Sequence, residues 1–150
     1  MNNRSRFSPV AGRLACVAML FLAGCSSSPQ REIRGQVSLD GQPLESGEIL
    51  FKPTAGSVGP TAGSSITDGE YSIPAVAQGV IAGNQYQVSI TSMAGSGRMA
   101  PDPNEPTGQR ELLENIVPER YNTDTELTIT VSADKSENVF DFPLESTPEL

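Results

Sequence analysis

The chain has 150 residues and a formal net charge of −8, and it contains neither histidine nor tryptophan. Without histidine it cannot build a Ser-His-Asp triad, a Cys-His nucleophile pair or a histidine-ligated zinc centre. The excess of carboxylates makes nucleic acid and anionic lipid headgroups poor partners, because both are negatively charged.

The first element in chain order is an N-terminal signal peptide. Arg4, Arg6 and Arg13 precede an apolar run at residues 14–24. A helix rises only about 1.5 Å per residue, so a run of this length falls short of the roughly 30 Å hydrocarbon core of a bilayer. We therefore interpret residues 1–24 as a signal peptide that is removed.

The end of this run, Leu22-Ala23-Gly24-Cys25, resembles the bacterial lipobox. The resemblance implies cleavage between Gly24 and Cys25, and a Cys25 that carries diacylglycerol with acyl chains of the palmitate type. Each buried acyl CH₂ contributes about 0.8 kcal/mol, so several chains on one residue give effectively permanent attachment. The alternative is an ordinary signal peptide with a chance cysteine.

A lipid anchor places the protein in the cell envelope. Ser26 follows the cysteine, where an Asp indicates inner-membrane retention in many diderm bacteria. We therefore expect the outer membrane, facing the periplasm or the surface, rather than the inner membrane.

Removal of the signal peptide also removes Cys16, so the mature chain has no free thiol and no possible disulfide. Seven basic residues remain against eighteen acidic ones, which gives the mature chain a net charge of −11. Its length suits one domain that is stabilised by a core. We assign residues 25–31 to the lipidated cysteine and a short tether, residues 32–146 to this domain, and residues 147–150 to a C-terminal tail.

Seven short segments of the domain alternate apolar and polar residues with the period of two that is typical of half-buried strands. Asp40-Gly41 and Asp68-Gly69 supply tight turns. We therefore predict an all-β fold, a single antiparallel β-sandwich of about seven strands, immunoglobulin-like or prealbumin-like. The segments lie at residues 33–39, 47–53, 65–67, 71–73, 85–90, 126–131 and 138–144.

The alternation also predicts which side chains point into the core. Tyr71 and Tyr86 are expected to pack there with their hydroxyls at the rim. The role of Tyr121 is left open, because this residue either packs or serves as a ligand platform. Glu119-Arg120 beside it is a candidate to cap or pin the corner before the next strand. The other predicted core residues include Ile49, Phe51, Val88, Ile129, Phe140 and Phe142.

Three longer stretches carry a family resemblance. IRGQVSLDGQPLESGEILFKP (33–53), ITDGEYSIPAVAQG (66–79) and NQYQVSI (84–90) together resemble the carboxypeptidase regulatory-like domain, a transthyretin-like sandwich frequent in bacterial envelope proteins. VPERYN (117–122) and the two segments after it are similar to small single-domain lipoproteins of that group. The matched pieces cover most of residues 32–145. The resemblance implies a noncatalytic role in folding, adhesion or binding.

The longest segment without a predicted strand is a loop at residues 93–118, and loops of this length are usually functional or disordered. Its prolines and glycines exclude regular structure in the first half. In the second half, Leu112, Leu113 and Ile116 fit one or two helical turns against the sandwich. The segment is thus either a binding loop or a mobile surface excursion.

Four residues are candidates for binding if this loop is functional. They are Asp102, Asn104, Glu105 and, at the end of the segment, Tyr121. Carboxylate and amide oxygens suit Ca²⁺, but the spacing matches no complete calcium loop, so we assign no metal.

Catalysis is not expected. The mature chain lacks a nucleophilic cysteine, and its acidic residues give no preferred pair for glycoside hydrolysis. We therefore predict no enzyme activity and no cofactor.

Two classes of function remain for a noncatalytic envelope protein. In the first, the lipid-anchored domain is a binding or adhesion module that presents its loops to an envelope protein, a peptide or a polysaccharide. In the second, it is a structural component of the envelope or of a larger surface assembly, packed against other copies by its strand edges or acidic face. The membrane is contacted through the N-terminal lipid in both classes.

Overall fold

A computed structural model of the chain describes residues 29–75, 79–105 and 107–147. The signal peptide, its cleavage site at Gly24 and Cys25, and residues 148–150 of the expected tail lie outside these ranges. Within them, regular structure is almost entirely β-strand, with two short 3₁₀ turns, η1 (Glu119–Tyr121) and η2 (Lys135–Glu137). No helix in the described ranges combines the length and the apolar character that a bilayer crossing requires.

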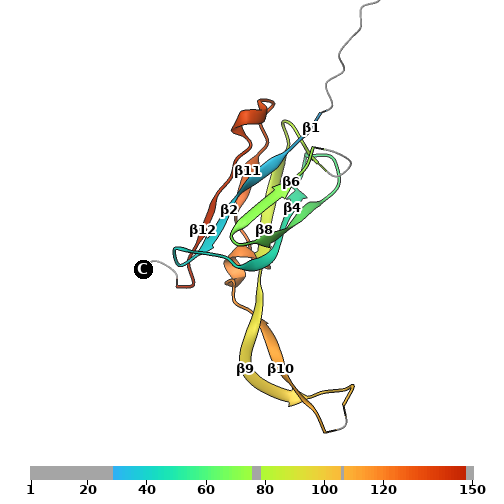
Figure 1. Ribbon diagram of the computed structural model, residues 1–150. Helices are drawn as coiled ribbons and strands as arrows, with labels where there is room; N and C mark the ends of the chain where they lie inside the picture. Colours follow the sequence, from blue (N-terminus) through green and yellow to red (C-terminus); the bar gives the residue numbers. More distant parts are fainter. Residues whose placement is uncertain (1–28, 76–78, 106, 148–150) are drawn as a thin grey trace, which may run out of the picture.

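The all-β prediction is therefore confirmed, and eight strands form the main sheet (Figure 1). Seven of them pair in the order β11-β8-β4-β5-β6-β2-β12, and the short β3 pairs with β2. The bounds are β2 (Ile33–Leu39), β3 (Gln42–Pro43), β4 (Ser46–Pro53), β5 (Ala62–Thr67), β6 (Glu70–Ile73), β8 (Gln85–Thr91), β11 (Thr128–Thr130) and β12 (Phe142–Leu144).

Each of the seven predicted segments contributes one strand to this sheet, and the two Asp-Gly turns have the expected backbone. Asp40 and Asp68 both have φ of +51°, and the glycines that follow have φ of +77° and +80°. Glycine adopts this left-handed region without steric cost, and Asp tolerates it. The second turn joins β5 to β6.

The main sheet curls so that strands far apart in its order face each other. Phe51 on β4 and Phe142 on β12 have ring centroids 6.5 Å apart. Tyr71 on β6 lies 5.9 Å from Phe51 and 6.1 Å from Phe142. The corner of the curl is the junction of β5 and β6, which pair only at Thr67 and Glu70.

The inward-facing residues form one hydrophobic core. Of the predicted core residues, Ile49, Phe51 and Val88 are completely inaccessible, while Ile129 and Phe142 are buried and Phe140 is partly buried against the cluster. Tyr86 is also inaccessible, and its hydroxyl accepts a hydrogen bond from the Ile81 backbone N–H at 3.0 Å. This arrangement satisfies the one polar atom of a large buried ring.

One pairing departs from the antiparallel expectation, because β12 lies parallel to β2. The approach of β12 brings the Phe140 carbonyl against Gly35, where a Cβ would lie 1.8 Å from the carbonyl oxygen. Only a glycine lets the two backbones come this close. The position of the edge strand β12 therefore depends on a residue without a side chain.

Two small strand pairs lie outside the main sheet. One joins β1 (Gln30–Arg31) to β7 (Val80–Ile81), so pairing begins inside the expected tether. The other joins β9 (Met93–Pro101) to β10 (Gln109–Asn115), and we call it the ribbon. In Figure 1 the ribbon projects from the end of the body opposite β1.

The expectation for residues 93–118 was wrong. Most of this segment forms the ribbon, not an irregular loop followed by a helical turn. The glycines of β9 tolerate extended backbone, and Pro101 ends the strand, opposite Gln109. Leu112 and Leu113 point to opposite faces of β10, because successive side chains of a strand alternate. Residues 109–115 therefore form a strand paired with β9, where the two leucines had favoured a helical turn.

Candidate functional site

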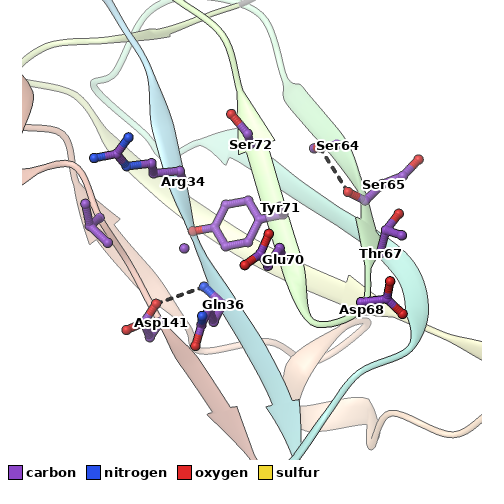
Figure 2. Close-up of a pocket in the computed structure, with 12 residues that line it drawn as sticks. Arg34, Gln36, Ser64, Ser65, Thr67, Asp68, Glu70, Tyr71, Ser72 and Asp141 are labelled. Carbon is purple, nitrogen blue, oxygen red and sulfur yellow. Dashed lines mark hydrogen bonds between the residues drawn. The ribbon is translucent and has the colours of Figure 1, made fainter.

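An open cleft of about 850 Å³ is lined by residues of β5, β6, β2 and the segment that precedes β12. β5 and β6 pair only at Thr67 and Glu70. Beyond this point the two strands diverge, which leaves the corner of the curled sheet open. Figure 2 shows polar side chains on its walls and the Tyr71 ring at its centre. The lining residues include Arg34, Gln36, Ser64, Ser65, Glu70, Ser72 and Asp141.

Strand register explains why polar groups gather here. Gly35 is opposite Tyr71, and Arg34 is opposite Ser72, in the antiparallel pair of β2 and β6. Tyr71 is therefore buried in the core, whereas Arg34 and Ser72 are exposed on the other face. On the β12 side, the Gln36 backbone N–H donates to the Asp141 carboxylate at 2.8 Å and fixes that acid at the cleft wall.

Tyr71 is the one buried titratable group of the cleft, and its hydroxyl donates to the Phe140 carbonyl at 2.8 Å. Burial raises the pKa of the phenol well above its usual range, and the negative charge of Asp141 raises it further. The phenol therefore stays protonated at neutral pH and is not available as a base or nucleophile.

The cleft has the chemistry of a polar binding surface. Asp68, Glu70 and Asp141 supply three negative charges, and Arg34 supplies one positive charge. Hydroxyls and carboxylates bind amines and sugar hydroxyls through hydrogen bonds. No group of three or more acidic or thiol side chains that could hold a metal ion occurs in the part of the chain that the structure describes.

The ribbon is the second candidate site, and polar bonds fix its root to the body. The Asn115 side-chain oxygen accepts from the backbone N–H groups of Ser92 at 3.0 Å and Val117 at 3.2 Å. The Ser92 hydroxyl donates to the Ser46 carbonyl on β4 at 2.6 Å. These contacts set the direction in which the ribbon leaves the body.

A bulge in β9 shapes the middle of the ribbon. The register shifts between Glu111 and Leu113, and Gly97 has φ of +71° in the bulged part of β9. The Glu111 carboxylate accepts from the Gly97 backbone N–H at 2.8 Å. Arg98 forms an ion pair with Glu114 across the ribbon, and both side chains are more than half exposed.

One face of the ribbon carries exposed apolar side chains beside Glu111. Residues opposite each other in an antiparallel pair share a face, so the pairs Leu113 with Gly95, and Glu111 with Met99, extend the face that also carries Met93. Met93, Met99 and Leu113 are 54%, 56% and 61% exposed. Exposed apolar residues that gather on one element mark an interaction surface more often than scattered ones do.

The structure separates the four residues predicted to bind. Asp102, Asn104 and Glu105 lie at the tip of the ribbon, where the Asp102 carboxylate accepts from the Asn104 backbone N–H at 2.8 Å. A second bond, from the Gly108 N–H to the Glu105 carbonyl at 2.9 Å, closes the turn. These acidic and amide groups therefore shape the tip.

Tyr121 lies in η1 at the base of the ribbon, away from the tip (Figure 1). The Arg120 guanidinium stacks on its ring at 4.7 Å and donates to the Glu145 carbonyl. The Tyr121 hydroxyl accepts from the Glu145 backbone N–H at 3.3 Å. The pair thus holds the chain that follows β12, which agrees with a role in pinning this corner.

Sequence reasoning missed both the cleft and the ribbon. The cleft joins residues from four separate segments, so no local sequence pattern predicts it. The ribbon had one usable signal, because QRELLEN at residues 109–115 has no glycine or proline and follows a turn-forming Asp-Pro-Asn sequence.

No protein-family model matches the chain, and no curated protein sequence matches it. Among solved structures, a 9R-lipoxygenase from Cyanothece PCC8801 aligns over 78% of this chain with 12% identity and a TM-score of 0.33. This chain covers 16% of the lipoxygenase chain. A similarity at this score does not define a shared fold.

Proposed function

We propose that the protein is a lipid-anchored, noncatalytic component of the cell envelope that acts as a binding or adhesion module. The observation that carries the proposal is the opposition of the two ends in Figure 1, with β1 at one end and the ribbon at the other. A lipid on Cys25 would hold the β1 end near the membrane. The ribbon, with its exposed apolar side chains, would then project away from the membrane toward partners.

The tether supports this orientation because it is short. Five residue steps separate Cys25 from Gln30, where β1 begins, and an extended chain covers at most about 18 Å over that length. The outer membrane, facing the periplasm or the surface, is the proposed location. The mature net charge of −11 favours contact with the membrane through the lipid alone, since anionic headgroups repel an acidic domain.

The finer fold assignment belongs to the same proposal. The Phe51, Tyr71 and Phe142 contacts across the curled sheet support two facing layers. A transthyretin-like sandwich of the carboxypeptidase regulatory-like kind, with the ribbon as an added feature, accommodates them. The cleft, with its hydroxyls and carboxylates, is the proposed contact for a polysaccharide or a polar peptide.

The anchor is tested with Cys25→Ala in intact cells. We expect the variant to leave the membrane fraction or to keep its signal peptide, because the acylation site is lost. Normal cleavage together with unchanged membrane fractionation would show that Cys25 is not the anchor.

The binding surface is tested by crosslinking two variants in the same cells. In the first, an Asn-Gly turn replaces residues 95–113 and joins Ala94 to Glu114, which keeps the bonds at the ribbon root. In the second, Ser72→Tyr fills part of the cleft from an exposed strand position. We expect both to melt like the parent, and one of them to lose the envelope component that the parent crosslinks. Unchanged crosslinks in both folded variants would refute the proposed surfaces.

A further inference from the structure

The two outer edges of the ribbon differ in their ability to pair. β9 is bulged at residues 96–98, carries Gly95 and Gly97, and ends in Pro101. β10 is an unbroken strand without glycine or proline, and it pairs only with β9 among the described strands. Bulges and prolines protect sheet edges from further pairing, so β9 is protected and β10 is open.

Hydrogen bonds at both ends of β10 show which backbone groups face its open edge. The Asp102 N–H donates to the Gly108 carbonyl at 2.9 Å, and the Ile116 N–H donates to the Ser92 carbonyl at 2.9 Å. Even-numbered residues of this stretch therefore point their N–H and C=O groups at β9. Because these directions alternate along a strand, the odd-numbered residues point theirs outward.

The sequence of this edge is complementary to itself. When β10 is placed antiparallel to a second β10 about a two-fold axis at Leu112, Arg110 of each copy lies opposite Glu114 of the other. Leu112 then faces Leu112, and Glu111 faces Leu113. Glu111 and Leu113, whose backbone N–H and C=O groups point outward, then form a backbone hydrogen-bonded pair, as the alternation requires.

Neighbouring registers lose this complementarity. A shift that centres the axis on Glu111 places two carboxylates opposite each other, and centring it on Arg110 or Glu114 pairs like charges. Centring it on Leu113 places Glu114 against Leu112. Like charges directly opposite each other destabilise a strand pair, so the charges select the register centred on Leu112.

We propose that two copies of this chain pair through β10 in this register and form a four-stranded antiparallel sheet from two ribbons. An isolated two-stranded ribbon is marginally stable in water, and two further strands supply what it lacks. Glu114 would then lie between Arg98 of its own chain and Arg110 of the second copy. The inference identifies a partner for the assembly alternative, and it does not depend on the lipid anchor.

The register is tested by disulfide crosslinking of the full chain in cells, with copper phenanthroline as the oxidant. Leu112→Cys should give a covalent dimer, because the two-fold places the substituted residues in a non-hydrogen-bonded pair with Cα atoms about 4.5 Å apart. Leu113→Cys is the matched control, since its two copies lie diagonally at about 7 to 8 Å and bridge poorly. The parent chain controls for Cys16 and Cys25.

The charges are tested by complementation. Arg110→Glu alone and Glu114→Arg alone each place two like-charge pairs in the dimer, so each should weaken self-association of the detergent-extracted full chain about tenfold. A mixture of the two variants restores both opposite-charge pairs and should form a mixed dimer with the parent affinity. Thermal melting checks that each variant is folded.

A dimer from Leu112→Cys, little from Leu113→Cys, and recovery in the mixture support the proposal. Equal crosslinking at both positions, or failure of the mixture to recover, overturns the register. A Leu112→Cys product at a mass other than twice the chain, or no product from a folded variant, overturns self-pairing. Because the Cys25→Ala variant can carry the same substitutions, loss of the anchor and loss of the dimer are separate results.

Discussion

The body and the ribbon are both built from β-strands, but different interactions hold them. In the body, every strand of the main sheet except the short β3 buries apolar residues against a shared core, and the two faces of each of these strands differ in polarity. In the ribbon, nearly all side chains are exposed or half-exposed, and its fixed geometry comes from cross-strand bonds and polar contacts at its root. Burial therefore specifies the body, and pairing specifies the ribbon.

The largest difference is expected from truncation of apolar side chains. Phe51→Ala should lower the free energy of unfolding by about 3 to 5 kcal/mol, because Phe51 is inaccessible and contacts two other rings. Met99→Ala in the ribbon should change it by less than about 0.5 kcal/mol. Urea unfolding measures both, with Phe51→Leu as a milder body variant. Equal effects at the two sites would remove the distinction between body and ribbon.

Two glycines give a second comparison. Gly35→Ala should cost about 3 kcal/mol, because the new methyl meets the Phe140 backbone and forces β12 away. At Gly95 the three atoms nearest to the ideal Cβ belong to the Glu111 carboxylate, at 2.6 to 2.7 Å, and that flexible side chain can move. Thermal melting should show a large drop for the first and little change for the second. A stable Gly35→Ala variant would contradict the close approach of the two backbones.

Two asparagines test the polar contacts. Asn138 is 1% exposed, and its side chain bonds the backbone of Ser132 in both directions, at 2.8 and 3.1 Å. Asn138→Ala should cost about 2 kcal/mol, because it leaves the partly buried N–H and C=O of Ser132 without their partners.

Asn115→Ala is the matched change at the exposed ribbon root. It should cost less than about 1 kcal/mol, but it should speed amide hydrogen exchange selectively in β9 and β10. If exchange accelerated throughout the body instead, the ribbon would not be a separate unit.

The smallest effect on stability is expected from lowering the pH. Hydrogen bonds from Ser146 lower the pKa of Asp40, and hydrogen bonds from Ser136 lower the pKa of Asp134. A carboxyl whose pKa is lower in the folded state stabilises it above the unfolded pKa of about 4, and this contribution is lost as the pH falls through the folded value.

Asp40→Asn combined with Asp134→Asn should therefore make the melting temperature fall less between pH 5 and pH 3. Asn also tolerates the positive φ at position 40. Both groups belong to the body, so a ribbon probe should not respond to the change. An unchanged pH profile would show that neither carboxyl contributes.

This contrast also explains which parts could be predicted from the sequence. The seven body strands were predictable because burial imposes a period of two on residues such as Tyr86, Val88 and Ile90. The ribbon buries neither face, so no such period marks it, and the adjacent Leu112 and Leu113 favoured a helix. The parallel contact of β12 with β2 and the cleft depend on tertiary packing between distant segments, which local patterns do not record.

The parallel pair of β2 and β12 also affects how the chain folds. It joins residues 37–39 to residues 142–144, so the strand that completes the aromatic cluster is among the last to be synthesised. Closing so long a loop is entropically costly, and topologies rich in distant pairings fold slowly. We expect chains that end before residue 142 to expose Phe51 and Tyr71 and to be degraded. For a protein proposed to leave the cytoplasm, late closure would also keep the chain unfolded while it is exported.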